Sequence, residues 1–305
     1  MGLKLLDVES FVPTRKIENS FFESYLDTSH EWIQKRTGIV SRYFSDQGLS
    51  LMIKEALKKM NIKEEWKEKI DLILTATISP DYIMPSVSAI VHGCLDLKEE
   101  VLCSDMNMAC TGFVGALIFA EKFLEVGQCA ICIGAEQLSS ITDFHDRSTA
   151  MLFGDGVAVA LIMKTEDKVS KVYGTQVSHD LSLKNGEGKK VEMDGKNIYK
   201  FATSICPKGI KKLLEIDGSQ IESMDWIVLH QANSRIIDSV AKKVGGQEKF
   251  YQNIQEMGNT SSASIGLCLG EMKEKALLKQ GNRLLLFAFG GGLTYAGIIV
   301  EWGKE

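Results

Sequence analysis

The sequence predicts an α/β fold made of two similar halves, on three observations. The chain has 305 residues, 45% of them hydrophobic and 25% charged, which is typical of a globular enzyme and excludes a disordered or fibrous chain. Short apolar runs typical of buried strands alternate with longer stretches typical of helices. The order strand, helix, glycine, strand occurs twice, at an offset of 154 residues. A duplicated α/β unit accounts for all three.

The repeat sets the expected order of elements. In chain order, strands are expected over residues 71–75, 101–104, 130–134, 157–163, 226–229 and 284–289, and helices over 110–124, 235–244 and 265–272. The offset pairs Ala109 with Ala263, Gly112 with Gly266, and Gly127 with Gly281. The two halves are expected over residues 1–165 and 166–305, packed as one body. The polar, glycine-bearing stretch 182–195 is expected to be a surface excursion.

Charge and hydropathy limit the kinds of partner. Lys and Arg number 35 and Asp and Glu 40, a net charge of −5 that argues against a general nucleic-acid binder. Asp7 and Glu9 interrupt the apolar stretch that a secretory signal requires. The longest uncharged run, 284–300, is short for a membrane span and contains four glycines, so two strands around a glycine turn are expected. We expect no nucleic-acid or membrane partner.

Cysteine usage indicates reduced thiols and a cytoplasmic location. The seven cysteines are odd in number and scattered. Cys129 and Cys132 form a CxxC pair, but on a strand residues three apart point to opposite faces. The pair should therefore neither bridge nor share a metal, and no second Cys/His pair has zinc-ligand spacing. No metal site is predicted.

Cys110 is the first candidate for chemistry. It follows the expected strand 101–104 and begins a helix whose apolar face carries Phe113 and Leu117. A cysteine at a helix amino terminus experiences the positive end of the helix dipole, which favours the thiolate. Gly112 permits close approach of another backbone or a substrate. The alternative is a small buried core cysteine, the usual state of free cysteines.

His230 and Asn259 are the second and third candidates. His230 ends the strand 226–229, and ligands gather at the carboxyl ends of strands in α/β sheets. Asn259 precedes the second copy of the cysteine helix, within a run of small and hydroxyl residues. The duplication puts all three residues on equivalent edges of the two halves, where they could converge. A structural histidine and a helix-capping loop are the alternatives.

These residues lie in motifs that resemble β-ketoacyl-acyl-carrier-protein synthase III, the initiating condensing enzyme of type II fatty acid synthesis. The motifs are NMACTGF at 107–113, HQANSRI at 230–236, GNTSSAS at 258–264, FGGGLT at 289–294, DTSHEWIQKRTGI at 27–39, DR at 146–147 and FGDG at 153–156. They follow the family's order over nearly the whole chain. The resemblance implies a thiolase-like fold in α/β/α/β/α layers.

The resemblance also implies a reaction. Cys110 would attack an acyl-CoA thioester and hold the acyl group. The backbone N–H groups of Cys110 and Gly291 would form the oxyanion hole. His230 and Asn259 would stabilise the enolate formed when malonyl-acyl carrier protein loses carbon dioxide. No metal or redox cofactor is implied, and CoA enters as part of a substrate.

Further residues receive roles only through the resemblance. Trp32 and Arg147 would hold the CoA adenine between them, with Arg36 near the phosphates. Packing and solvation are the alternatives for these three. Arg235, Lys242 and Lys243 lie on one face of a helix and would dock an acidic carrier protein, where a solvated face is the usual explanation.

Met84 would bound the acyl pocket across a homodimer interface, or serve as ordinary dimer packing. Two departures from the family affect loops and close specificity: the first strand carries Leu-Asp-Val-Glu at 6–9 in place of Gly-x-Gly, and the loop after Tyr43 is short.

Three alternative functions stay open. A related condensing enzyme of biotin or secondary-metabolite biosynthesis would use the same three residues on another acyl-CoA. A cysteine thioesterase or acyltransferase would not need Asn259. A non-catalytic paralogue would be expected to lack part of the trio. A nucleotide-dependent dehydrogenase is excluded, because no Gly-x-Gly-x-x-Gly follows an early strand.

Overall fold

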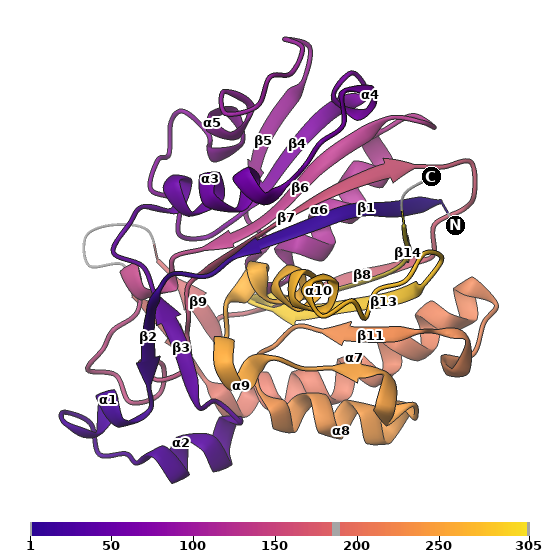
Figure 1. The fold of residues 1–305 in the computed structure, drawn as a ribbon. Coiled ribbons are helices and arrows are strands. Elements are labelled where there is room, and N and C mark those ends of the chain that lie inside the picture. The colour runs from indigo at the N-terminus through magenta and orange to yellow at the C-terminus, as the bar shows by residue number, and fades with distance from the viewer. Residues whose placement is uncertain (1, 185–189, 304–305) are drawn as a thin grey trace.

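Strands and helices alternate in five layers in the computed structural model, which describes residues 2–184 and 190–303. Figure 1 shows the layers in order: outer helices, a sheet, two central helices, a second sheet, and a second pair of outer helices. The predicted α/β/α/β/α arrangement is confirmed. It places the carboxyl ends of strands from both sheets around the central helices.

The two sheets have the same strand order. The first runs β1 (Leu3–Phe11), β7 (Gly156–Lys164), β6 (Cys129–Glu136), β4 (Ile70–Ala76) and β5 (Leu102–Met106). The second runs β8 (Lys171–Ser178), β14 (Gly292–Trp302), β13 (Arg283–Gly290), β11 (Trp226–Leu229) and β12 (Phe250–Tyr251). In each, the three strands farthest from the sheet junction are parallel, as βαβ crossovers require. A short parallel contact between β1 and β14 joins the sheets.

Helices cover both faces of each sheet and bury the apolar strands. The outer helices are α3 (Leu49–Lys59) and α5 (Val87–His92) on the first sheet, and α7 (Gly195–Asp217) and α8 (Ser234–Val244) on the second. Between the sheets lie α6 (Gly112–Phe123) and α10 (Ser264–Glu274), whose side chains belong to one apolar core with both sheets. Because most of their residues are buried between the sheets, their sequences are apolar around most of the circumference.

Shorter elements gather beside the carboxyl ends of the strands. They are β2 (Arg15–Glu18), α1 (Ser20–Glu23), α2 (His30–Thr37), β3 (Ser41–Phe44), α4 (Glu64–Lys67), β9 (Leu181–Leu183), β10 (Val191–Met193) and α9 (Ile254–Met257). Of these, α4 alone stands apart, at the opposite end of β4. The pair β2 and β3 is antiparallel, as is the hairpin of β9 and β10. These segments supply the walls of the cavities described below.

No single offset relates all the elements of the first half to those of the second. The offset of 154 relates β6 to β13, and Gly127 (φ 87°) to Gly281 (φ 82°). The central helices, however, are related by 152 residues: α6 follows a 3₁₀ turn at Ala109–Thr111, and α10 follows one at Ser261–Ala263. Pairing Ala109 with Ala263 was therefore wrong by two residues. The predicted boundary at 165/166 falls between β7 and β8, and the division into two domains stays a prediction.

Candidate active site

Cys110 lies at the carboxyl edge of the first sheet, in the 3₁₀ turn that leads from β5 into α6. The preceding residue, Ala109, takes the left-handed conformation with φ 44°. Gly290, the last residue of β13, comes so close that a Cβ added there would lie 2.6 Å from the Cβ of Cys110. Only glycine permits this approach. The second half of the chain therefore contacts the cysteine directly.

The Cys110 side chain is 7% exposed, and this burial determines the protonation state of its thiol. Burial raises its pKa to about 11. The nearby Ser261 hydroxyl and the N–H groups of Cys110 and Gly291 lower the pKa, and Glu136 raises it. The expected thiolate is therefore wrong for the free protein, because loss of hydration outweighs the position at a helix start.

The N–H groups of Cys110 and Gly291 both lie close to the Cys110 sulfur. Thr294 holds Gly291 from the other side, since its hydroxyl donates to the Gly291 carbonyl over 3.0 Å. The Thr294 hydroxyl also lies 3.0 Å from that of Thr111, next to the nucleophile. Gly291 is thus restrained on both sides. Its role toward a substrate oxygen stays a prediction.

His230 follows β11 and is 1% exposed. Its N–H donates to the carbonyl of Phe287 over 2.9 Å, which extends the strand pairing by one residue. Its Nδ1 lies 2.7 Å from the hydroxyl of Ser264, the first residue of α10. That hydroxyl accepts from the N–H of Gln231 and has the imidazole as its acceptor. Ser264 therefore donates to Nδ1, and Nε2 carries the ring proton.

Burial also keeps His230 neutral. It lowers the pKa of the imidazole to about 3, so the ring stays uncharged at physiological pH. A neutral imidazole with its proton on Nε2 is a hydrogen-bond donor that brings no net charge into the site.

Asn259 is held by main-chain contacts between the two halves. Its N–H donates to Leu152 over 2.9 Å, and its carbonyl accepts from Gly154 over 3.0 Å. The side-chain Oδ1 accepts the N–H of Ser261 at 2.9 Å. That bond leaves the carboxamide NH₂ as the donor group of a side chain that is 6% exposed.

Cys110, His230 and Asn259 line one small cavity of about 80 Å³, together with Phe289 and Gly290. The three candidates come from different elements, far apart in sequence, and the fold brings them to one space. The cavity opens in two directions, each of which leads to a larger one.

The first larger cavity, of about 480 Å³, shares Cys110 and is mostly apolar. Among its lining residues are Leu138, Phe153, Leu181, Leu183 and Val191. The stretch 182–195 is therefore not a plain surface excursion, because β9 and β10 turn apolar side chains inward. Alternation of apolar and polar residues over 181–183 and 191–193 was the strand signal that sequence reasoning missed. Residues 185–189 lie outside the described chain.

The second larger cavity, of about 520 Å³, reaches the surface and carries the predicted CoA residues Trp32, Arg36 and Arg147. Leu152, Met193, Gly195, Tyr199 and Asn233 line both it and the small cavity, so the two adjoin. The basic surface pocket therefore lies next to the cavity that Cys110 lines.

Trp32 and Arg147 meet, but they leave no gap. The guanidinium carbon of Arg147 lies 4.3 Å from the centre of the Trp32 ring, a direct cation–π contact. An adenine ring between them would need each surface at van der Waals distance from it, about 7 Å in all. The predicted adenine site is closed in this structure, and both exposed side chains must separate to admit a base.

The three residues expected to dock a carrier protein lie on the exposed face of α8. Arg235 lines the surface cavity, 5.7 Å from the ring of Tyr199. Lys243 donates to the carbonyl of Thr203 on α7 over 2.7 Å, so its ammonium also has a structural partner. Lys242 is exposed. Met84 is 86% exposed and lies outside the cavities that Cys110 lines.

The two cysteines of the CxxC pair lie on opposite faces of the first sheet, as their position on a strand predicts. Cys129 packs in the core between the first sheet and its outer helices, and Cys132 packs in the core between the two sheets. In residues 2–184 and 190–303, acidic, histidine and cysteine side chains form no group of three suited to a metal ion. Every helix in that part of the chain is too short or too polar to cross a membrane.

Comparison with known proteins agrees with the sequence motifs. Two family models match: 3-oxoacyl-[acyl-carrier-protein (ACP)] synthase III over residues 104–180, and the C-terminal part of the same family over residues 214–302. A β-ketoacyl-[acyl-carrier-protein] synthase III of Clostridium acetobutylicum is 38% identical over 99% of each chain.

Solved structures agree as well. The 3-oxoacyl-[acyl-carrier-protein] synthase III of Aquifex aeolicus VF5 superposes with a TM-score of 0.90 at 33% identity, covering 98% of this chain and 100% of that one. The priming β-ketosynthase of the R1128 polyketide biosynthetic pathway gives 0.90 at 27% identity, over 99% and 97% of the two chains.

Proposed function

The chain belongs to the 3-oxoacyl-[acyl-carrier-protein] synthase III family of condensing acyltransferases in fatty acid biosynthesis, and from this premise we propose its reaction and site. The enzyme condenses an acyl-CoA starter with malonyl-acyl carrier protein through an acyl group held on Cys110. The observation that carries the proposal is the single cavity lined by Cys110, His230 and Asn259, which adjoins a basic surface pocket.

In the first half-reaction the Cys110 sulfur attacks the carbonyl carbon of the acyl-CoA thioester. The negative oxygen that forms accepts hydrogen bonds from the N–H groups of Cys110 and Gly291, the oxyanion hole. The nearness of both N–H groups to the Cys110 sulfur supports this role. The carbon–sulfur bond to CoA breaks, and the thiol proton leaves with the CoA thiolate. Because the free thiol has a pKa of about 11, proton removal accompanies attack on the bound thioester.

In the second half-reaction the malonyl thioester occupies the vacated path and loses carbon dioxide. The Nε2–H of His230 and the NH₂ of Asn259 donate to the thioester oxygen and stabilise the enolate. Ser264 supports this role because its donation to Nδ1 places the imidazole proton on Nε2. The enolate carbon attacks the acyl-Cys110 carbonyl, the carbon–sulfur bond breaks, and the released Cys110 thiolate takes a proton from water. Thioester cleavage and decarboxylation drive the reaction, so it needs no metal or redox cofactor.

The surface pocket and α8 receive the two carriers. Trp32 and Arg147 separate to bind the adenine of CoA, and Arg36 binds its phosphates. Arg235, Lys242 and Lys243 give α8 a basic face on a chain of net charge −5, which suits an acidic carrier protein.

The enzyme works as a homodimer in the cytoplasm. β5 forms one edge of the sheet, and large apolar side chains on β5 and on the central helix α6 are exposed: Leu102 52%, Phe119 56% and Phe123 50%. Apolar patches of this kind mark interaction surfaces. Met84, which is 86% exposed, is then available to reach the partner's acyl pocket.

A second candidate is condensation in a specialised pathway, favoured by the likeness to the polyketide priming synthase. It differs from the first only in the acyl group that Cys110 accepts. Condensation in biotin biosynthesis stays an alternative, because it too would differ only in the acyl group that Cys110 accepts. A non-catalytic paralogue conflicts with the shared cavity of the three residues.

Separating the two half-reactions tests the roles of His230 and Asn259. Replacing either by alanine removes one enolate donor, so we expect malonyl decarboxylation to fall at least about 100-fold. Acylation of Cys110 should change by less than about tenfold, because neither residue belongs to the oxyanion hole. Both rates are measured on the purified variants, by release of carbon dioxide and by mass spectrometry.

Asn253→Ala is the matched control. Asn253 lies six residues upstream, is also buried, and bonds to Glu271 instead of lining the site. It should lower stability while keeping the ratio of the two rates. Equal losses of acylation and decarboxylation in Asn259→Ala would contradict the assignment.

A further inference from the structure

Glu136 is a completely buried carboxyl group for which the reaction above has no use. It ends β6 and has an exposed fraction of 0%. Its Oε2 accepts from the Ser79 hydroxyl at 2.6 Å, the Ile78 N–H at 3.1 Å and the Thr77 hydroxyl at 3.3 Å. Its Oε1 lies 2.9 Å from the hydroxyl of Ser262 in the second half. One carboxyl thus joins the end of β4 to the turn that precedes α10.

Counting protons defines the state of this carboxyl. The Ser262 hydroxyl has one proton and two oxygens within 2.9 Å, the carbonyl of Ala76 and Oε1 of Glu136. The carbonyl can only accept. An ionised carboxylate would have to share the single Ser262 proton with Ala76 in a three-centre bond. A proton on Oε1 that is donated to Ser262 gives each contact a proton of its own. The three donors at Oε2 have no such conflict.

The surroundings agree with a neutral acid. Burial raises the pKa of Glu136, and no cationic side chain is among the groups that affect it. The titratable groups that face it from the adjoining elements are Cys110, from the turn before α6, and Asp155, which precedes β7 and whose pKa burial also raises. A negative charge at Glu136 would oppose the developing thiolate of Cys110.

The position of Ser262 gives the contact its consequence. Ser262 follows Ser261, whose φ of 47° is left-handed and whose N–H fixes the side chain of Asn259. In the register of 152 residues, Ser262 is the counterpart of Cys110 itself. The contact between Glu136 and Ser262 therefore holds the turn beside Asn259, and that turn packs against the turn that carries Cys110.

We propose that Glu136 is a positioning residue: protonated on Oε1, it locks the Asn259 turn onto the strand ends beside Cys110 without adding a negative charge there. The roles of Cys110 and Asn259 in this statement rest on the proposed function. The protonation state does not, because it can be measured without any acyl substrate.

Glu136→Gln and Glu136→Leu test the proposal. Glutamine reproduces a neutral acid, because its NH₂ can donate to Ser262 while its oxygen accepts from Ser79 and Ile78. Leucine fills a similar volume and makes neither bond. Iodoacetamide labelling of the Cys110 peptide is followed against pH by mass spectrometry, which separates it from the exposed Cys94.

We expect the midpoint of labelling in Glu136→Gln to lie within about half a pH unit of wild type. Infrared difference spectra of wild type minus Glu136→Gln near neutral pH should contain the band of a protonated carboxyl group. Condensation should fall at least about tenfold in Glu136→Leu and be largely restored by glutamine.

Two results would overturn the proposal. A labelling midpoint lower by about one unit or more in Glu136→Gln would mean that a negative charge had been removed. A carboxylate band in the difference spectrum would mean the same. If the leucine variant does not fold, the comparison of wild type with glutamine decides alone. If no acyl-CoA acylates Cys110, the proposed function fails while labelling and spectra still report on Glu136.

Discussion

Cys110 differs from the other buried cysteines in what surrounds its sulfur. Burial raises the pKa of Cys132 and Cys206 without any opposing hydrogen bond. Near the Cys110 sulfur, the Ser261 hydroxyl and two N–H groups oppose that effect, and Cys110 borders two cavities. A thiol that is protonated at rest is protected from adventitious oxidation. Its polar neighbours and its access to the cavities therefore set Cys110 apart as the proposed nucleophile.

The buried His230 should make the protein sensitive to acid. Its pKa is about 3 when folded and near its ordinary value of 6.5 when unfolded. Between these values the unfolded chain binds more protons, so this contribution to stability is complete above about pH 6.5 and is lost as the pH falls. We expect the free energy of unfolding to fall between pH 7 and pH 4.5 by about 2 kcal/mol more in wild type than in His230→Gln.

Urea denaturation at the two pH values measures the difference. Comparing two variants under the same conditions cancels the contributions of Glu136 and Asp155. Equal losses in the two proteins would mean that His230 is not buried as a neutral ring.

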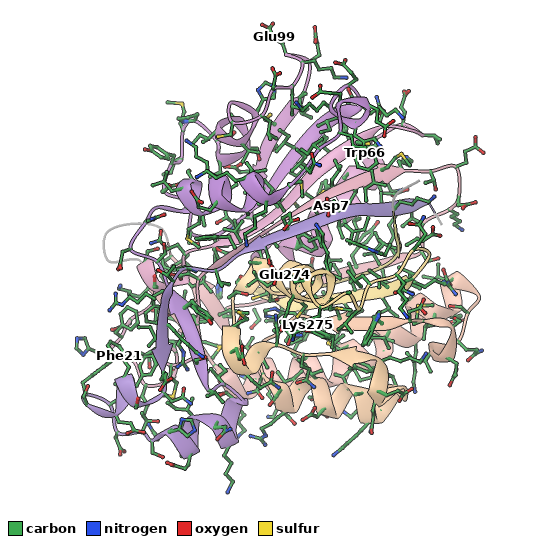
Figure 2. The ribbon with its side chains drawn as sticks, viewed as in Figure 1. Asp7, Phe21, Trp66, Glu99, Glu274 and Lys275 are labelled. Atoms are coloured by element: carbon green, nitrogen blue, oxygen red, sulfur yellow. The ribbon has the colours of Figure 1, made fainter. Side chains whose placement is uncertain are left out.

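At the scale of elements, an ion cluster connects β1 to the central helix α10. Lys273 contacts both Asp7 and Glu9, and Asp7 is 3% exposed. Figure 2 labels Asp7 on β1, with Glu274 and Lys275 on the neighbouring helix end. The two acids that replace the family's Gly-x-Gly thus share one cation from the second half. Asp7 and Glu9, which depart from the family's pattern, therefore have a structural partner in Lys273.

Removing that cation should be costly. Lys273→Met leaves the buried Asp7 without its ion pair, and we expect the free energy of unfolding to fall by about 2 kcal/mol. Lys275→Met is the matched control, since the Lys275 side chain is 56% exposed in its pair with Glu271 and should lose less than about 0.5 kcal/mol. Urea denaturation of both variants gives the comparison. Similar losses in the two would contradict the role of the cluster.

Sequence reasoning located the strands and helices more accurately than it predicted the burial and the contacts of the site residues. Periodicity and the repeat gave six strands within two residues, because short apolar runs are a local signal, whereas β1 and β8 were not predicted. The register of α10 was missed by two residues, since the turn at Ser261–Ala263 is fixed by contact with the first half. The pKa of Cys110 was missed because burial is a property of the whole fold. Glu136 was missed because its four partners are far from it in sequence.

At the scale of the molecule, the fold leaves an apolar surface without a partner in the single chain. Phe119→Glu places a charge in the patch beside β5, and we expect the dissociation constant of the homodimer to rise at least about 30-fold. Leu51→Glu is the control, because Leu51 is 50% exposed on α3, on the opposite face of the first sheet. Sedimentation equilibrium measures both variants. A dimer unchanged by Phe119→Glu, or a monomeric wild type, would contradict the proposed interface.

The account depends most on one covalent event, the transfer of an acyl group from CoA to the Cys110 sulfur. Intact-protein and peptide mass spectrometry after incubation with acyl-CoA thioesters of different length and branching detects it directly, with Cys110→Ser as the control. We predict that at least one thioester adds its acyl mass to the Cys110 peptide, that the serine variant stays unmodified, and that malonyl-acyl carrier protein then removes the acyl group as a β-ketoacyl product. An unmodified Cys110 across the whole panel, in a folded protein, would contradict the account.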